Sequence, residues 1–121
     1  MKRSEIAYIA GLFDGEGDVG IYPYKATKNG KLYPKLTARI HNTHKQALDW
    51  VYEKFGFGLV CMDRKGIKQS GNPARKQSYV YIVAHKKARE FLKIVMKYLI
   101  IKKNKVAKVL KEDNLYMNRE R

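Results

Sequence analysis

Three carboxylates stand close together in an otherwise basic sequence. Asp14, Glu16 and Asp18 follow an apolar run in the stretch IAGLFDGEGDVGIY, residues 9–22. The run is typical of a helix, and the C-terminal end of a helix disfavours each negative charge by roughly 0.3–1 kcal/mol. A bound divalent cation would offset that cost, because hard cations such as Mg²⁺ prefer carboxylate oxygens. The basic surroundings would also offset it, and without a metal the same residues would be caps and turn formers.

Common metal-binding and catalytic motifs do not account for this acidic bend. An EF-hand loop that began at Asp14 would need glycine at its sixth position and glutamate at its twelfth, where this chain has Val19 and Lys25. The sequence holds no Walker A, nucleophile-elbow, H-E-x-x-H or dinucleotide-binding pattern. His41 and His44 are spaced as a metal-ligand pair can be, but a hairpin exit or a helix start explains them more simply.

The charge balance indicates a polyanionic partner. The chain has 26 Lys and Arg against 11 Asp and Glu, which gives a formal net charge of +15, and it has nine tyrosines. A merely soluble basic surface, or the lysine-rich exterior of a thermophilic protein, is the plainer alternative. We favour nucleic acid over an anionic membrane surface, because no segment has the large apolar face of a basic amphipathic anchor.

The sequence also indicates where in the cell the protein is expected. No apolar run reaches the roughly 20 residues of a membrane span, and the basic and apolar N-terminal residues lack the small-residue cleavage site of a signal peptide. A single cysteine, Cys61, excludes an internal disulfide framework and a cysteine zinc cluster. We therefore expect an intracellular protein, in the cytoplasm or an organelle matrix.

Residues 1–121 suffice for one compact domain, and their hydrophobic periodicity predicts an α+β fold. Helices are expected over 4–13, 42–56, 86–99 and 103–113, and strands over 18–27, 31–41, 57–63 and 78–84. Asn29-Gly30 is a strong hairpin signal between the first two strands. The resulting order, α-β-β-α-β-β-α-α, predicts a four-stranded antiparallel sheet with the helices on one face and the other face free.

Capping residues set the expected helix ends. Ser4 can cap the first helix, and it should stop where the glycines begin, at Gly15, Gly17 and Gly20. Asn42 or Thr43 can cap the second helix, and Gly56 can end it.

The free face of the sheet is the expected nucleic-acid surface. Alternation in the second strand places Lys35, Thr37, Arg39 and His41 on one face, opposite Leu36, Ala38 and Ile40 on the core face. A twisted sheet of this kind can lie in a nucleic-acid groove. The second hairpin is ambiguous, because Tyr79, Tyr81 and Val83 compete with Val80 and Ile82 for the core. The candidate DNA contacts are Tyr22, Tyr24, Tyr33, Lys35, Thr37 and Arg39 on the first hairpin, and Arg64, Lys65, Lys68, Arg75 and Lys76 in the basic loop over 64–77.

Residues 9–17, IAGLFDGEG, resemble the LAGLIDADG motif of homing endonucleases over nine consecutive positions. The expected element order matches that family's αββαββα fold, a saddle-shaped four-stranded antiparallel sheet with helices on one face, so the resemblance spans nearly the whole chain. One motif implies the homodimeric type of the family. A stripe at helical spacing, Ala7, Ala10, Gly11 and Asp14, would form the dimer interface, since small residues let two helices approach closely.

The resemblance also implies roles for individual residues. Glu16 fills the acidic position that binds the catalytic metal, with the carbonyl oxygen of Gly15 as a further ligand, and Asp14 serves the helix end and the partner contact. Asn42 would orient the attacking water, and Gln46 is a second polar pocket residue. Lys102 would be the pocket lysine, with Lys103 and Lys105 as close competitors.

The resemblance thus predicts a Mg²⁺-dependent, sequence-specific double-strand DNA endonuclease, intron-encoded and acting as a homodimer. Its target would be long and roughly palindromic, and its cut would leave 3′ overhangs. A non-cleaving RNA-splicing maturase or DNA-binding regulator of the same fold is the alternative. RNA binding like that of a ribosomal protein would explain the charge but not the acidic bend.

Overall fold

A computed structural model describes residues 1–25, 28, 30–63 and 76–119 of the chain, with the backbone alone for 117–119. Its elements alternate as the hydrophobic pattern predicts. In chain order they are α1 (Arg3–Glu16), β1 (Gly17–Lys25), β2 (Leu32–Asn42), α2 (Lys45–Phe55), β3 (Leu59–Met62), β4 (Tyr79–Ala84), α4 (His85–Val95), a 3₁₀ turn (Met96–Tyr98) and α5 (Lys103–Arg119).

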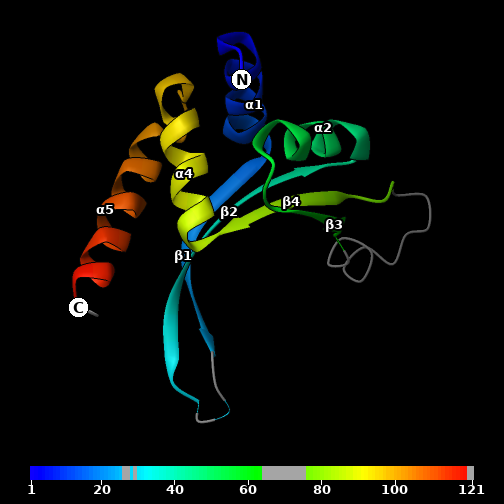
Figure 1. Ribbon diagram of the computed structural model, residues 1–121. Helices are drawn as coiled ribbons and strands as arrows, with labels where there is room; N and C mark the ends of the chain where they lie inside the picture. Colours follow the sequence, from blue (N-terminus) through cyan, green and yellow to red (C-terminus); the bar gives the residue numbers. More distant parts are fainter. Residues whose placement is uncertain (26–27, 29, 64–75, 120–121) are drawn as a thin grey trace.

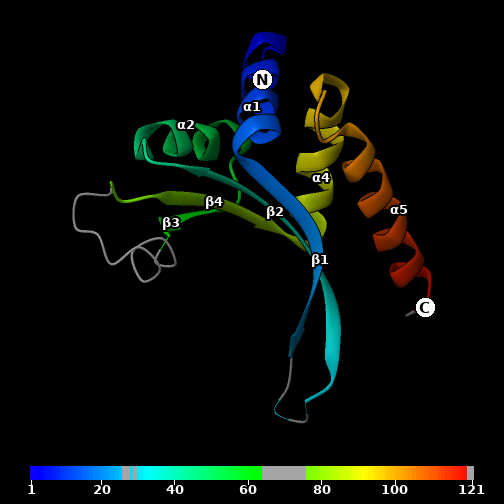
Figure 2. The same cartoon turned by 180° about the vertical axis from the view of Figure 1, so that it is seen from behind.

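The described residues form one antiparallel sheet that the helices cover on one side. The strand order is β1-β2-β4-β3. Figures 1 and 2 show α1, α2, α4 and α5 on the same side of this sheet, while the far ends of β1 and β2 reach beyond the helix layer. The predicted α+β architecture and the free sheet face are confirmed. No helix in the described part of the chain is long and apolar enough to cross a bilayer.

Strand register decides which side chains face the helices. Gly17 pairs with Ile40 and Lys25 with Leu32, so Leu36, Ala38 and Ile40 of β2 turn into the core as predicted. The second hairpin is no longer ambiguous, because Tyr81 is fully buried in that core while Val80 and Ile82 alternate onto the other face.

Aromatic side chains join the sheet to the helix layer. Phe13 of α1 and Tyr81 of β4 both contact the ring of Phe91 in α4, at centroid distances of 5.4 and 6.0 Å. The Tyr81 hydroxyl donates to the carbonyl oxygen of Phe57 at 2.8 Å, and burial raises the pKa of Tyr81, so this hydroxyl stays a neutral donor.

The starts of α1 and α2 and several helix ends differ from the sequence prediction. Helix α4 ends at Val95, before the 3₁₀ turn, instead of at 99, and α5 continues to Arg119 instead of ending at 113. Helix α1 begins at Arg3 after Lys2, not after Ser4, and the backbone N–H of Lys2 donates to Glu5 Oε1 at 2.8 Å. Helix α2 is capped by His44, whose Nδ1 accepts from the Ala47 N–H, instead of by Asn42 or Thr43. The predicted end at Gly56 is confirmed, with a left-handed φ of 74°.

Helix α1 also runs through Gly15 to Glu16 instead of stopping near Phe13. The decisive glycine is Gly17, because a Cβ there would lie 2.5 Å from the Phe13 carbonyl oxygen and 2.8 Å from that of Arg39. Only a residue without a side chain lets β1 leave the helix so close to β2. Gly20 lies inside β1 and ends no helix.

Replacing Gly17 should therefore destabilise the fold, whereas replacing Gly15 should not. We expect Gly17→Ala to lower the free energy of unfolding by about 1–3 kcal/mol, because backbone atoms must move to admit the methyl group. A Cβ at Gly15 meets nothing within 4 Å, and alanine favours the helix by about 1 kcal/mol. Urea unfolding at neutral pH measures both variants. Equal stability of the two would contradict the close approach at Gly17.

Candidate nucleic-acid interface and metal site

The three carboxylates of the acidic bend point to different partners. Asp14 is buried, Glu16 is exposed at the last residue of α1, and Asp18 lies in β1 on the free face of the sheet. Among the residues that the structure describes, no group of three His, Cys, Asp or Glu side chains could hold a metal ion. The bend is therefore not a closed cation cage within one chain.

Asp14 ties the end of α1 to the start of α5. Its Oδ2 accepts the backbone N–H groups of Ile100 and Ile101 at 2.9 Å each, and its Oδ1 accepts that of Lys102 at 2.8 Å. Burial raises the pKa of Asp14, but these N–H groups and the charge of Lys102 lower it more, so its pKa falls below the usual value. The carboxylate at the end of α1 is thus stabilised by three backbone N–H groups of the segment that leads into α5.

Lys102 reaches the same bend. Its Nζ donates to the carbonyl oxygen of Asp14 at 2.5 Å, which satisfies a carbonyl at the C-terminal end of α1. The predicted pocket lysine therefore lies beside the acidic bend, with its ammonium engaged at the helix end. The competitors Lys103 and Lys105 are exposed in the first turn of α5.

Glu16 is the one of the three carboxylates that is left for a ligand. It makes no hydrogen bond or ion pair with any residue in the described part of the chain. Gly15, whose carbonyl is the other predicted ligand, is also exposed. One carboxylate and one carbonyl suit a hard cation but supply only part of the six or more oxygens that it needs. The remaining oxygens would come from outside this chain.

Asn42 and Gln46 belong to a groove between α1 and α2. The groove has a volume of about 670 Å³, and its lining includes Tyr8, Leu12 and Trp50. Asn42 Oδ1 accepts from the backbone N–H of His44 at 2.8 Å. Gly17, the residue after Glu16, pairs with Ile40 of β2. Asn42 follows Ile40 by two residues at the end of the same strand. The structure brings Asn42 near the acidic bend but records no contact between Glu16 and Asn42 or Gln46.

The stripe of small residues on α1 does not form one surface. Ala10 is fully buried in the core and Asp14 is only 8% exposed, so neither side chain can reach a second copy. This corrects the expected interface of four residues. Ala7 is half-buried, and Gly11 is exposed with open space where a Cβ would be.

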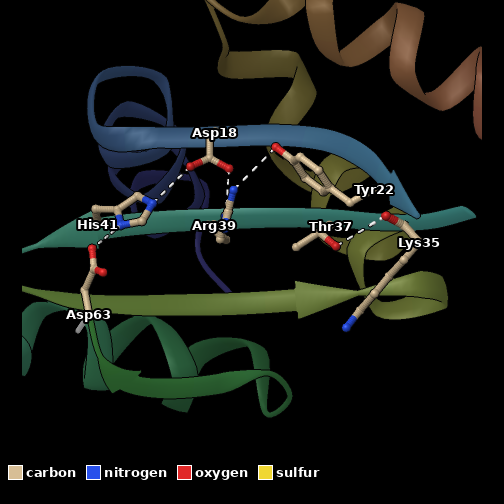
Figure 3. Close-up of polar contacts among 7 residues, drawn as sticks. All are labelled: Asp18, Tyr22, Lys35, Thr37, Arg39, His41 and Asp63. Atoms are coloured by element: carbon tan, nitrogen blue, oxygen red, sulfur yellow. Dashed lines mark hydrogen bonds and ion pairs between the residues drawn. The ribbon is translucent and has the colours of Figure 1, made fainter. Parts of the chain in front are cut away.

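The free sheet face carries a hydrogen-bonded network that the sequence did not reveal (Figure 3). Asp18 Oδ1 accepts from Arg39 Nε at 2.8 Å, and Asp18 Oδ2 lies 3.0 Å from His41 Nε2. His41 Nδ1 in turn lies 3.3 Å from Asp63 Oδ2. Arg39 Nη2 lies 3.4 Å from the hydroxyl of Tyr22. The pairing of Asp18 with Arg39 follows from the strand register, which places them directly opposite each other.

The other candidate DNA contacts are distributed along the first hairpin. Lys35 lies opposite Tyr22 in the register, with its Nζ 5.8 Å from the ring centroid of Tyr24, and Tyr24 contacts Tyr33. Thr37 is only 7% exposed, and its hydroxyl lies 3.4 Å from the Lys35 carbonyl oxygen, so it presents little surface. Lys76 is exposed. The remaining predicted contacts lie outside the described residues: Arg64, Lys65, Lys68 and Arg75.

Solved structures share this arrangement of helices and sheet. The homing endonuclease I-CvuI, in complex with its target in the presence of calcium, matches with a TM-score of 0.76 and 16% identity over 97% of this chain and 70% of that chain. The archaeal intron-encoded homing endonuclease I-Vdi141I, complexed with DNA, matches with a TM-score of 0.69 and 21% identity over 95% and 70%. The LAGLIDADG homing endonuclease I-GzeII, in complex with its DNA target, matches with a TM-score of 0.68 and 21% identity over 95% and 37%.

The chain has the LAGLIDADG homing endonuclease fold. No protein-family model matches the sequence, and neither does any curated protein. The fold predicted from residues 9–17 and the element order is thus confirmed by the backbone.

The Asp14 anchor predicts a specific loss of stability. We expect Asp14→Asn to lower the free energy of unfolding by about 1–3 kcal/mol at pH 7, because an amide cannot accept three N–H groups as a carboxylate does. The folded-state pKa of Asp14 is lowered, so its contribution is full above the unfolded pKa of about 3.9 and is lost as the pH falls through the folded value. Urea unfolding from pH 7 to pH 2 measures the difference.

Glu16→Gln is the matched control, since an exposed carboxylate without a described partner should change stability by less than about 0.5 kcal/mol. A difference between the wild type and Asp14→Asn that stays constant down to pH 2 would contradict the role of the charge.

Proposed function

We infer that this chain is a sequence-specific DNA endonuclease that works as a homodimer with a divalent metal. The observation that carries the proposal is the position of Glu16. Its exposed carboxylate ends α1 at the junction with β1, where the free sheet face begins, and it has no partner in the described part of the chain. A carboxylate left in this position suits a cation held beside a phosphate on that face.

Charge supports DNA as the substrate. The chain carries a net charge of +15, and its free sheet face presents Lys35, Arg39 and tyrosine rings. Solved structures of I-CvuI, I-Vdi141I and I-GzeII, which share the fold, contain DNA. A long, roughly palindromic duplex would fit a dimer in which each sheet contacts one half of the target.

A second copy would complete the metal site. One chain offers Glu16 and the Gly15 carbonyl, and a two-fold axis beside α1 would bring a second pair to the same place. The exposed surface around this part of α1 is apolar, because Ile100 is 87% exposed, Ile101 75% and Tyr8 57%. Gly11 leaves room for the partner helix. This surface supports pairing through α1.

The chain's own groups would divide the work of hydrolysis. A divalent cation, when bound, supplies positive charge and an activated water next to the scissile phosphate. Glu16 and the Gly15 carbonyl would hold it, and Asn42 would orient the water with Gln46 nearby. Lys102 or its neighbour Lys103 would stabilise the negative charge that develops in the transition state. The groups of the two protomers would cut one DNA strand each, with a stagger that leaves 3′ overhangs.

Removing the Glu16 charge should separate cutting from binding. We expect Glu16→Gln to slow Mg²⁺-dependent cleavage by about 100-fold or more, because the amide is a poor cation ligand, while DNA affinity is retained. Cleavage of a duplex selected from a random library, and its binding in calcium, measure the two properties. Glu112→Gln, which makes the same change on the exposed side of α5, is the control.

Selective binding of duplex DNA by the wild type without cleavage in any divalent metal would contradict the endonuclease and favour the DNA-binding regulator. Preference for a structured RNA over every duplex would favour the maturase.

Bulk at Gly11 should block the dimer and leave the monomer intact. A Cβ there meets nothing within 4 Å, so we expect Gly11→Gln to keep or raise the free energy of unfolding, by up to about 1 kcal/mol. The same side chain would keep two α1 helices apart. Sedimentation of the protein on its DNA should show a dimer for the wild type and for Asn104→Gln, but a monomer for Gly11→Gln. A Gly11→Gln variant that still forms the dimer would place the interface elsewhere.

A further inference from the structure

The pair formed by Arg39 and Asp18 on the free sheet face carries an inference that rests on the proposed function and deepens it. We propose that Arg39 is a specificity-determining residue that reads a guanine of the DNA target. Asp18 is the positioning residue that holds the guanidinium of Arg39 for this contact. Figure 3 shows the two side chains side by side across β1 and β2, with Tyr22 and His41 on either side.

The guanidinium of Arg39 is held from two directions. Its Nε donates to Asp18 Oδ1 at 2.8 Å, its Nη2 lies 3.4 Å from the Tyr22 hydroxyl, and its Cζ lies 5.3 Å from the centroid of the Tyr22 ring. His41 fixes the carboxylate from the other side, with Nε2 3.0 Å from Asp18 Oδ2. An arginine ordered in this way has already lost much of the rotamer freedom that binding would otherwise take from it.

The main chain beneath Arg39 is also fixed. β2 lies between β1 and β4, and Arg39 pairs with Asp18 on one side and with Ile82 on the other. A residue in a central strand cannot shift its backbone without breaking both ladders. The reading group is therefore fixed to a rigid strand and not to a loop.

The outer edge of this guanidinium is left for a ligand. Asp18 takes the Nε–H, while Nη1 has no hydrogen-bond partner among the residues that the structure describes. Nη1 and Nη2 together present two parallel N–H donors. That fork matches the O6 and N7 acceptors of guanine in the major groove, and it also matches two oxygens of a phosphate.

The charge of Asp18 favours the base over the phosphate. Asp18 neutralises Arg39 at a separation of 2.8 Å, so an approaching phosphate meets both signs of charge and gains little net attraction. Lys35, four residues before Arg39 on the same face of β2, is paired with no carboxylate in the described part of the chain and is the better phosphate contact. A guanine edge is neutral, and needs only two donors in fixed positions.

The guanidinium of Arg39 stays protonated, and so remains a hydrogen-bond donor, over the working pH range. Partial burial lowers the pKa of Arg39, but the hydrogen bond and the charge of Asp18 raise it more, so the net pKa lies above its usual value. The fork therefore carries its full set of protons at any pH at which the protein would be used.

Selection from a random duplex library tests the proposal. The full chain is mixed with the library in calcium, the bound duplexes are sequenced, and the consensus is compared between variants. The wild type should strongly select a guanine at one position of each half of the target. Arg39→Lys should reduce the preference for that guanine by about 10- to 100-fold and leave the other positions unchanged, because lysine keeps the charge but lacks the fork.

Asp18→Ala separates positioning from electrostatics. This variant gains one positive charge, so a purely electrostatic role for Asp18 predicts tighter binding to every duplex with an unchanged consensus. Positioning predicts instead that the preference for the same guanine falls while the overall affinity holds or rises. Asp18→Asn, which keeps an oxygen to accept the Arg39 Nε–H, should retain more of the preference than Asp18→Ala.

Lys35→Ala is the matched control on the same face. It should weaken binding to all duplexes alike, lower the salt dependence by about one phosphate contact, and leave the consensus unchanged. If Arg39→Lys leaves the consensus unchanged and largely retains the affinity and the salt dependence, Arg39 is a phosphate contact, and the inference is overturned while the proposed function stands. A wild type that enriches no duplex would overturn both.

Discussion

A single buried carboxylate joins the two helices on which the acidic bend depends. Asp14 belongs to the last turn of α1, and its oxygens accept three successive backbone N–H groups, from Ile100 to Lys102, just before α5 begins. The ammonium of Lys102 in turn donates a hydrogen bond to the backbone carbonyl oxygen of Asp14. The end of α1 is thereby fixed on one side by α5 and on the other by the close approach of Gly17 to β2. Glu16, which lies between these two points, projects from a fixed backbone.

This constraint gives the three carboxylates three separate uses. Asp14 accepts backbone N–H groups within the fold and Asp18 is paired on the free face of the sheet, whereas Glu16 has no hydrogen bond or ion pair with any residue that the structure describes. One chain thus supplies too few ligands for a cation, which agrees with a centre shared between two copies. The exposed isoleucines next to Asp14, Ile100 and Ile101, fit the same picture, since two bare aliphatic side chains at a helix start are typical of a covered surface.

The free face combines two kinds of attraction that can be varied independently. The surplus of positive charge acts on every polyanion and weakens with salt. The Asp18–Arg39 pair adds nothing to that surplus, because its charges cancel. It adds direction instead, by fixing where two N–H donors point. Under the proposed function, which requires one site to be found among many, the second property matters as much as the first.

The sequence by itself determined the elements, the antiparallel sheet, its core face in β2 and the motif in α1, because hydrophobic periodicity and turn residues are local properties. It did not determine the partners of Asp14 and Asp18. A two-residue turn at Asn29-Gly30 would place Asp18 opposite His41, whereas the strands pair Asp18 with Arg39. A shift of the strand pairing by two residues keeps every side chain on the same face of the sheet, so the hydrophobic pattern of the sequence does not reveal it. Likewise, Asp14 meets residues 86 to 88 positions away, and only the packing of α1 against the turn before α5 could bring them together.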